Sequence, residues 1–223
     1  MTAPSAPPSD HGRRPPRRRL DAATRRATIL EAAIPVFASS GYDQTRMADI
    51  AARVGVTEPV IFQNFGTKAE LFAATLEQVA EQAIAHLGQL LQKHPSIDEW
   101  LRSLLSSGHV DEVHTAPMFG VLFEDAHRLQ FERGVSIALQ RAIARVADAL
   151  AHMLERGQAQ GSIRNDVDAS SLAWLVVSLI QARQFRRRFS PLPSQALEDD
   201  LVNGVLAAIS SVSDRSVQEP SSS

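Results

Sequence analysis

Hydrophobic residues recur every three or four positions over most of this chain, which is the period of an α-helix. The first stripe predicts a helix over residues 23–39, bent at Pro35 and stopped by Gly41. No run of alternating hydrophobic and polar residues makes a credible strand, so the fold is expected to be all-α. Further helices are predicted near 46–53, 57–65, 67–91, 116–131, 135–156, 169–188 and 195–211, and one that opens at Ser96 and carries Trp100, Leu101, Leu104 and Leu105.

Several of these boundaries fall at residues with capping chemistry. Thr45 is expected to accept hydrogen bonds from the first-turn amides of segment 46–53. Thr67 and Glu70 have the spacing of a capping box at the start of the long helix from 67. Other boundaries are assigned to Thr57 with Pro59, Ser96 with Glu99, Asp168, and Gly157 with Gly161.

The most specific pattern runs from Met47 to Asn64, where two short helical segments flank Gly55. Glycine supplies the left-handed backbone that a tight turn between helices needs, and Ala51 is small where the helices would cross. A helix-turn-helix has this pattern, and its second helix enters the major groove of DNA. Taken alone, the same spacing also fits a plain helical corner. The corner would be buried by Ile50, Val56 and Ile61.

Residues on both sides of this element extend the pattern: Ile29-Leu30-Glu31-Ala32-Ala33, Phe37, Gly41-Tyr42, Thr45, Met47-Ala48-Asp49-Ile50-Ala51, Gly55-Val56, Phe62, Phe65 and Lys68-Ala69-Glu70-Leu71-Phe72. From Arg26 to Phe72 the chain resembles the DNA-binding domain of the TetR family of transcriptional regulators. The resemblance implies an N-terminal three-helix DNA-binding domain, residues 22–66, followed by a larger helical domain for ligand binding and dimerisation, residues 67–212. Residues 1–21 and 213–223 are predicted to be a disordered Arg/Pro-rich leader and a disordered tail.

The resemblance also implies roles in DNA binding for individual residues. Thr45 and Lys68 match positions that contact phosphates, and Lys68 lies at a helix N-terminus, which favours anions. Phe62 departs from the tyrosine that is usual in the family, so it is interpreted as a core residue and one phosphate contact is in doubt. Base-edge contacts are expected from Thr57, Glu58, Pro59 and Val60, followed one turn later by Gln63 and Asn64.

Charge is distributed unevenly along the chain. The whole chain carries a net charge of -2, although residues 1–26 contain seven arginines and only two aspartates. Such a leader is either a solvated tail or a segment that contacts DNA. The recognition helix is poor in positive charge. Phosphate contacts from Arg46, and minor-groove contacts from Arg17, Arg18 and Arg19, would compensate for this.

Within the C-terminal domain, the resemblance implies that helices 169–188 and 195–211 pair with their copies in a homodimer. The predicted dimer residues are Leu172, Leu175, Val176 and Leu179, which ordinary core packing would also explain. The resemblance further implies a pocket for an unidentified small apolar or aromatic effector, although each candidate also suits a core. The candidates are Trp100, Met118, Phe119, Phe123, Met153 and Trp174, with His127 or Gln181 as polar partners.

Composition restricts other classes of function. The chain has no cysteine, which removes disulfides, thiol nucleophiles and thiolate metal sites, and no apolar run reaches the roughly 18 residues of a membrane span. The arginines near the N-terminus precede no apolar stretch, so no signal peptide is expected and the protein is interpreted as cytoplasmic, with no membrane partner. No cofactor or metal is expected.

Three alternatives remain at this point. A regulator of the same fold would act as a ligand-dependent activator or corepressor instead of a repressor released by ligand. A metal-dependent helical enzyme is suggested by the Glu-x-x-His spacing of Glu124 and His127, echoed weakly by Asp111 and His114, but no matching carboxylates are found on other helices. A helical adaptor that binds proteins is the third, and the helix-turn-helix followed by Lys68 argues against it.

Overall fold

The computed structural model describes residues 21–106, 108–109, 129, 131–191 and 194–210. The helix expected over 116–131 therefore lies outside the described residues, except at its end. So do the candidate residues Arg17, Arg18, Arg19, Asp111, His114, Met118, Phe119, Phe123, Glu124 and His127. The described part of the chain is helical, with one isolated β-bridge between Ile163 and Ser210.

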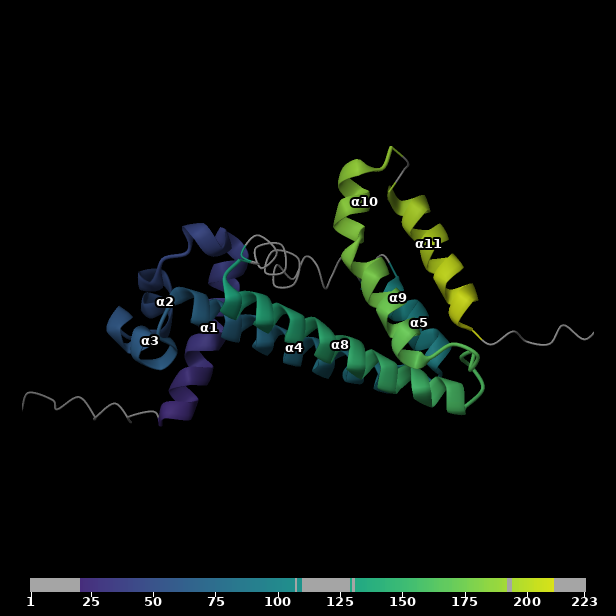
Figure 1. Ribbon diagram of the computed structural model, residues 1–223, viewed down its shortest axis with the longest axis horizontal. Coiled ribbons are helices and arrows are strands. Elements are labelled where there is room, and N and C mark those ends of the chain that lie inside the picture. The colour runs from purple at the N-terminus through teal and green to yellow at the C-terminus, as the bar shows by residue number, and fades with distance from the viewer. Residues whose placement is uncertain (1–20, 107, 110–128, 130, 192–193, 211–223) are drawn as a thin grey trace, which may run out of the picture.

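Helices α1, α2 and α3 occupy one end of the molecule, and α5, α9, α10 and α11 occupy the other (Figure 1). Two long helices, α4 and α8, pack along one another and connect the two ends. The bounds are α1 Ala22–Gln44, α2 Met47–Val54, α3 Glu58–Phe65, α4 Lys68–Lys93, α5 Ile97–Leu105, α8 Arg133–Ala159, α9 Ala169–Gln181, α10 Arg183–Phe189 and α11 Ser194–Ile209. None of the described helices is long and apolar enough to cross a membrane.

Each end of the molecule has its own buried cluster. The cluster of the first end joins α1, α2 and α3 to the first half of α4 and the start of α8, with Phe37 and Phe72 in an edge-to-face contact at 5.0 Å. The cluster of the second end joins the second half of α4 to α5, α8, α9 and α11 around the fully buried Trp100. Helices α4 and α8 contribute residues to both clusters and so connect the two ends.

Helix α1 is interrupted at Gly41, where the sequence predicted its stop, and a short helical stretch continues to Gln44. Gly41 is the residue inside α1 with non-helical dihedral angles, φ 72° and ψ 167°, whereas Pro35, the predicted bend, is not. A positive φ costs glycine little, because it has no Cβ, so Gly41 can turn the chain where most residues would be strained. Asp21 begins the helix, its Oδ1 accepting from the Thr24 backbone N–H at 2.8 Å.

The end of α8 corrects a second expectation. Gly157 and Gly161 were predicted to end this helix. α8 continues through Gly157 to Ala159, and the chain turns at Gly161, where φ is 75°, so only Gly161 has the expected role. A Cβ on residue 157 would lie 2.5 Å from Cγ1 of Ile163 and 3.0 Å from Cγ2 of Ile97. Glycine is needed at 157 for this close approach of neighbouring segments.

The helix expected over 169–188 is interrupted. Asp168 caps α9 as predicted, its Oδ1 accepting from the backbone N–H groups of Ser170 and Ser171 at 2.9 and 3.2 Å. The helix stops at Gln181, and α10 begins after Ala182. Arg186 on α10 joins this region to α11 through a buried ion pair with Glu198.

Candidate nucleic-acid interface

The segment between α1 and α2 is held by Thr45, in a way that the sequence did not predict. Its side chain is only 3% exposed, and its hydroxyl donates to the Gly41 carbonyl at 2.7 Å. The N-cap of α2 is Arg46, which makes no side-chain capping bond. Thr45 therefore stabilises the turn and neither caps α2 nor presents its hydroxyl to a phosphate in this structure.

The turn between α2 and α3 has the geometry expected of a helix-turn-helix. Gly55 adopts the left-handed conformation, φ 76° and ψ 34°, and its N–H donates to the Ala51 carbonyl at 2.9 Å. The Val56 N–H donates to the same carbonyl at 3.0 Å. Ile50 and Ile61 are fully buried across the corner, so the second helix is fixed to the first by packing and by this turn.

Helix α3 presents its outer face to solvent. Ile61 and Phe65, four residues apart, point into the core, which leaves Thr57, Glu58, Pro59 and Gln63 exposed and Val60 half-buried. Thr57 is the N-cap, although its side chain makes no capping bond. These exposed positions agree with the expected placement of the base-contacting residues.

Phe62 was interpreted as a core residue, and this is wrong. Its side chain is 42% exposed, because Ile61 and Phe65 take the inward positions of this eight-residue helix. The phenyl ring therefore lies on the outer surface, where the tyrosine of the family pattern would stand. An aromatic ring here is available for apolar contact with DNA, but it offers no hydroxyl.

The side-chain amide of Asn64, which was expected to contact DNA, is already hydrogen-bonded within the protein. Its side-chain nitrogen donates to the Val60 carbonyl within the same helix at 2.6 Å. Its own backbone carbonyl accepts from the guanidinium of Arg26, and the centre of that guanidinium lies 4.0 Å from the centroid of the Phe65 ring. Sequence reasoning missed this role of Arg26, because the partners lie 38 positions apart.

Lys68 lies at the first position of α4, beside the turn that follows α3. The capping box is confirmed: the Thr67 hydroxyl accepts from the Glu70 N–H at 3.1 Å, and the Glu70 carboxylate accepts from the Thr67 N–H at 2.8 Å. The ammonium of Lys68 donates to the Asp43 carbonyl at 3.2 Å and lies 4.6 Å from the centroid of the Tyr42 ring. Partial burial lowers the pKa of Lys68, and burial together with the nearby charges of Glu132 and Asp43 raises that of Tyr42.

The four described residues of the expected effector pocket do not converge. Trp100 is fully buried, and its indole N–H donates to the Leu87 carbonyl at 3.3 Å, so it is part of the core. Met153 packs partly buried against the same cluster. Trp174 and Gln181 are exposed, because α9 turns them away from that cluster. A single chain therefore does not enclose these four side chains together.

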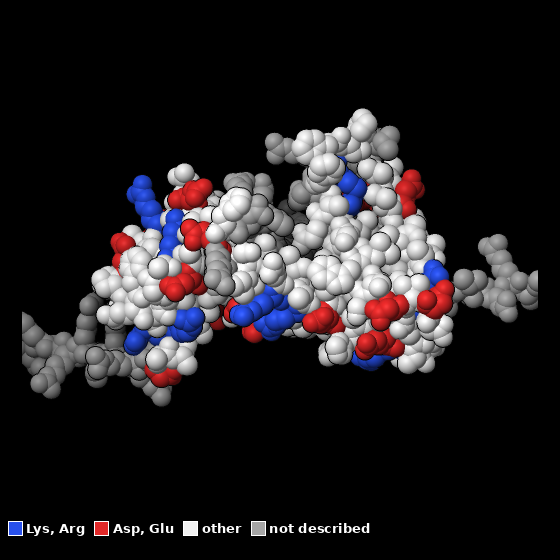
Figure 2. Space-filling model, viewed as in Figure 1, with Lys and Arg blue, Asp and Glu red and all other residues white. Residues whose placement is uncertain are grey.

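The expected dimer residues divide between two faces of α9. Leu172 and Val176 are buried in the core of their own chain, and Leu179 is half-buried against it. Leu175 lies on the exposed side with Trp174, at 40% and 46% exposure, and the view in Figure 2 shows few charges over α9. Two residues that the sequence analysis missed, Phe185 and Phe189 on α10, are 66% and 64% exposed, and their ring centroids lie 4.9 Å apart.

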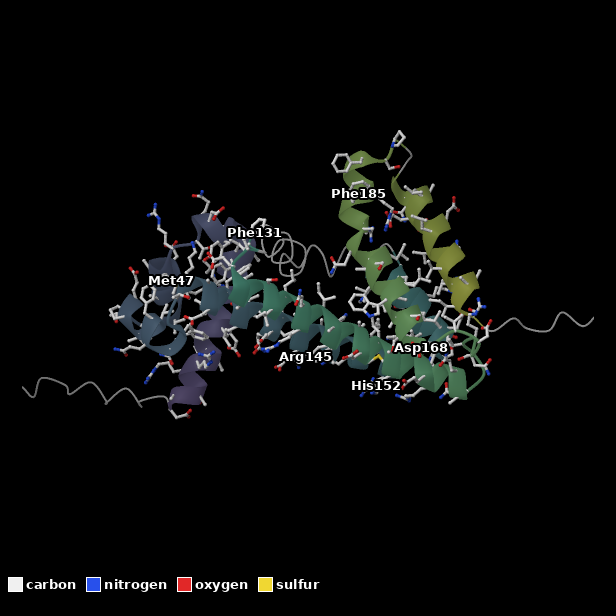
Figure 3. The ribbon with its side chains drawn as sticks, in the orientation of Figure 1. Met47, Phe131, Arg145, His152, Asp168 and Phe185 are labelled. Carbon is white, nitrogen blue, oxygen red and sulfur yellow. The ribbon has the colours of Figure 1, made fainter. Side chains whose placement is uncertain are left out.

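We call Trp174, Leu175, Phe185 and Phe189 the exposed stripe. Phe185 stands on α10, at the end of the molecule opposite Met47 of α2 (Figure 3). Among the described residues, no group of three or more His, Asp or Glu side chains is placed to hold a metal ion.

Comparisons with known proteins agree with the helix-turn-helix. Residues 29–75 match the family described as bacterial regulatory proteins, tetR family. The chain is 30% identical over 166 residues to the probable HTH-type transcriptional regulator ArpR of Pseudomonas putida, covering 70% of this chain and 78% of the relative. It is 25% identical over 194 residues to the HTH-type transcriptional activator FasR of Mycolicibacterium smegmatis, covering 87% of each.

The fold also matches that of a solved structure. The transcriptional regulator FadR of Bacillus subtilis, solved in complex with stearoyl-CoA, aligns with a TM-score of 0.63 at 18% identity. The alignment covers 82% of this chain and 98% of FadR. The likeness therefore extends from the helix-turn-helix through the helices that follow it.

Proposed function

This chain belongs to the TetR family of helix-turn-helix transcriptional regulators, and on that premise we propose that it is a repressor released from DNA by a small molecule. It would bind a palindromic operator as a homodimer, with residues 22–66 of each chain as a reading head. The observation that carries the DNA-binding part is the corner at Gly55, which fixes α3 with Thr57, Glu58, Pro59 and Gln63 outward. Regulators of this family are generally not enzymes, and we propose no catalytic role.

Contacts with DNA divide into two kinds in this proposal. Exposed side chains of α3 would read base edges in the major groove, with Gln63 able to pair with adenine. Arg46 and Lys68 would bind phosphates on either side, Lys68 with the help of the first-turn N–H groups of α4. Arg17, Arg18 and Arg19 would add minor-groove contacts from the leader. Asn64 and Thr45 are left out of this set, because the Asn64 amide is bonded within α3 and the Thr45 side chain is buried. Lys68 stays in it: its ammonium donates to the Asp43 carbonyl, but an ammonium has three N–H donors.

Dimerisation is supported by the exposed stripe. Two Phe rings, a Trp and a Leu are exposed on the consecutive helices α9 and α10, and large apolar side chains left in water together often mark an interaction site. A second copy of the same stripe, together with α11, would cover it. A twofold dimer would also place two reading heads on half-sites one helical turn apart, which a palindromic operator requires.

Release by an effector is supported by the arrangement of α4. This helix starts at Lys68, directly after the reading head, and ends among the helices of the second cluster. A ligand bound among those helices could therefore shift α4 and, with it, the reading head. FadR was solved in complex with stearoyl-CoA, so a chain of this fold can form a complex with a ligand that carries a long apolar acyl chain. We propose an effector of apolar or aromatic character, which needs only to prefer the state that does not fit the operator.

Activation is the second candidate, because FasR, which matches over 87% of this chain, is an activator. The two candidates differ in the position of the operator relative to the promoter, and they share the DNA-binding step. A reporter with the operator placed over or upstream of the promoter separates them. Repression predicts lower expression in the first arrangement, with recovery when the effector is added.

The DNA-binding step is tested by selecting binding sites from a random duplex library with the full-length protein. We expect a palindrome, bound with an affinity that falls steeply as salt is raised. Gln63→Ala should change the preferred base at one position in each half-site, and Gln89→Ala, an exposed change on α4, should not. If no sequence is enriched, and binding stays weak and salt-sensitive, the proposed function is wrong. A protein lacking residues 2–20 with unchanged affinity and salt slope would exclude the leader contacts.

A further inference from the structure

The C-terminal turn of the recognition helix is held by a residue of another helix. Arg26, in the second turn of α1, donates from Nη1 to the Asn64 carbonyl, and its guanidinium lies 4.0 Å from the centroid of the Phe65 ring. Both partners are in the last turn of α3. The contact therefore joins two helices at a point opposite the corner at Gly55.

The chemistry of these partners suits an arginine. The last carbonyls of a helix have no partner within it and carry partial negative charge, so a cation with N–H donors stabilises them. A guanidinium is planar and can donate in its plane while its face rests on an aromatic ring. The Asn64 side chain does not supply this link, because it folds back onto Val60 of its own helix.

We propose that Arg26 is a positioning residue for operator recognition. By fixing the end of α3 against α1, it sets the angle at which Thr57, Pro59 and Gln63 meet the bases. The corner at Gly55 fixes the beginning of the helix, and Arg26 fixes its end. This inference rests on the proposed function, and it assigns Arg26 an action through α3 in place of a direct contact with DNA.

A direct contact is the competing explanation, since Arg26 is exposed and positively charged. The two roles have different signatures. A phosphate contact strengthens binding to every sequence and adds about 0.9 to the slope of log affinity against log salt. A positioning contact strengthens binding only where the angle of α3 matters, which is at the operator, and leaves the salt slope unchanged.

The experiment compares full-length Arg26→Ala, Arg26→Lys and Arg25→Ala proteins on the selected operator and on a scrambled duplex of the same length. We expect Arg26→Ala to lose about tenfold or more in operator affinity, the size of a good base contact, with no loss on the scrambled duplex and no change in salt slope. Arg26→Lys should not restore the operator affinity, because an ammonium lacks the plane that covers Phe65. Arg25→Ala removes the same charge from the adjacent position and should leave the ratio of the two affinities unchanged.

Two results would overturn the proposal. Equal losses on both duplexes with a shallower salt slope, restored by Arg26→Lys, would identify a phosphate contact. A lower melting temperature with an unchanged affinity ratio would identify a purely structural role. If the unaltered protein itself fails to distinguish the two duplexes, the proposed function is wrong. If the unaltered protein distinguishes them and the Arg26→Ala protein does so equally well, only the proposal for Arg26 is wrong.

Discussion

Arg186 and Glu198 form a two-point ion pair that joins α10 to α11, with Nε to Oε1 at 2.8 Å and Nη2 to Oε2 at 2.7 Å. Their side chains are only 15% and 7% exposed, and Nη2 also donates to the Leu179 carbonyl at 2.9 Å. The pair therefore links α9, α10 and α11, and the exposed stripe belongs to the first two of these helices.

Removing one partner of this pair should be costly. Arg186→Met leaves Glu198 buried without its counter-charge, and we expect about 3–5 kcal/mol less stability in chemical unfolding. The double variant Arg186→Met/Glu198→Leu should recover most of that loss, because no buried charge remains. The control is Glu81→Ala, which breaks the exposed Arg145–Glu81 pair at 3.2 Å and should cost at most about 1 kcal/mol. Equal effects of Arg186→Met and Glu81→Ala would contradict the burial argument.

Two glycines in helices should respond in opposite directions to the same change. Gly157→Ala would place a Cβ 2.5 Å from Ile163 and should lower the melting temperature, despite the better helix propensity of alanine. At Gly88, inside α4, an added Cβ meets nothing within 4 Å. Gly88→Ala should therefore raise stability, by roughly 0.5–1 kcal/mol. Thermal unfolding of the two variants decides the point, and stabilisation by both would mean that Ile163 moves aside without cost.

Phe62→Tyr should strengthen operator binding. The ring is on the outer surface, and a hydroxyl there can reach a phosphate, a contact worth about 0.5–1.5 kcal/mol or roughly 2- to 10-fold in affinity. The melting temperature should not change, since the new hydroxyl is in water in the free protein. Titration of the selected operator measures the effect, and a loss of affinity would show that the ring contacts an apolar group of the DNA.

Lys68→Gln should weaken binding to operator and scrambled DNA alike, and reduce the salt slope by about 0.9 for each reading head. The second lysine of the chain, Lys93, lies at the other end of α4 and provides the control. Lys93→Gln changes the net charge equally and should leave the slope unaltered. If the two variants behave alike, the effect is one of overall charge.

The exposed stripe can be tested separately from the core beneath it. Trp174→Glu should give monomers in sedimentation velocity that retain their helical content, because the side chain is already 46% exposed in one chain. Val176→Glu, two residues later, places a charge in the core and should unfold the domain. Dimers formed by the Trp174→Glu protein would show that the interface lies elsewhere.

The parts of the structure that sequence predicted are those determined by neighbours along the chain. Gly55 and Ala51 lie in the same turn, and Thr67 and Glu70 in the same cap, so their spacing in the sequence is enough to predict the turn and the cap. Gly157 was predicted to be a helix end, because part of the reason for a glycine there, the close approach of Ile97, lies 60 positions away in the sequence.

The incorrect predictions at the candidate DNA-binding and dimer surfaces concern positions that are set by contacts between helices. Asn64 and Arg26 are far apart in sequence, and only folding brings them together. Helix α9 is apolar on nearly every side, so its pattern does not distinguish Val176, in the core, from Leu175, outside it. Phe62 has the chemistry of a core residue, but the inward positions of α3 are occupied by Ile61 and Phe65, so its ring is exposed.

In the proposed release, helix α4 would transmit a rotation from one end of the molecule to the other. Its 26 residues span about 39 Å at the usual rise of a helix, with Lys68 at the end proposed to meet DNA and Lys93 at the other. A tilt of only about 5° along that length displaces one end by about 3.4 Å, which is the rise of one base pair along a DNA strand. If the proposed release is correct, a small rotation at the far end would be enough to put a reading head one base step out of register.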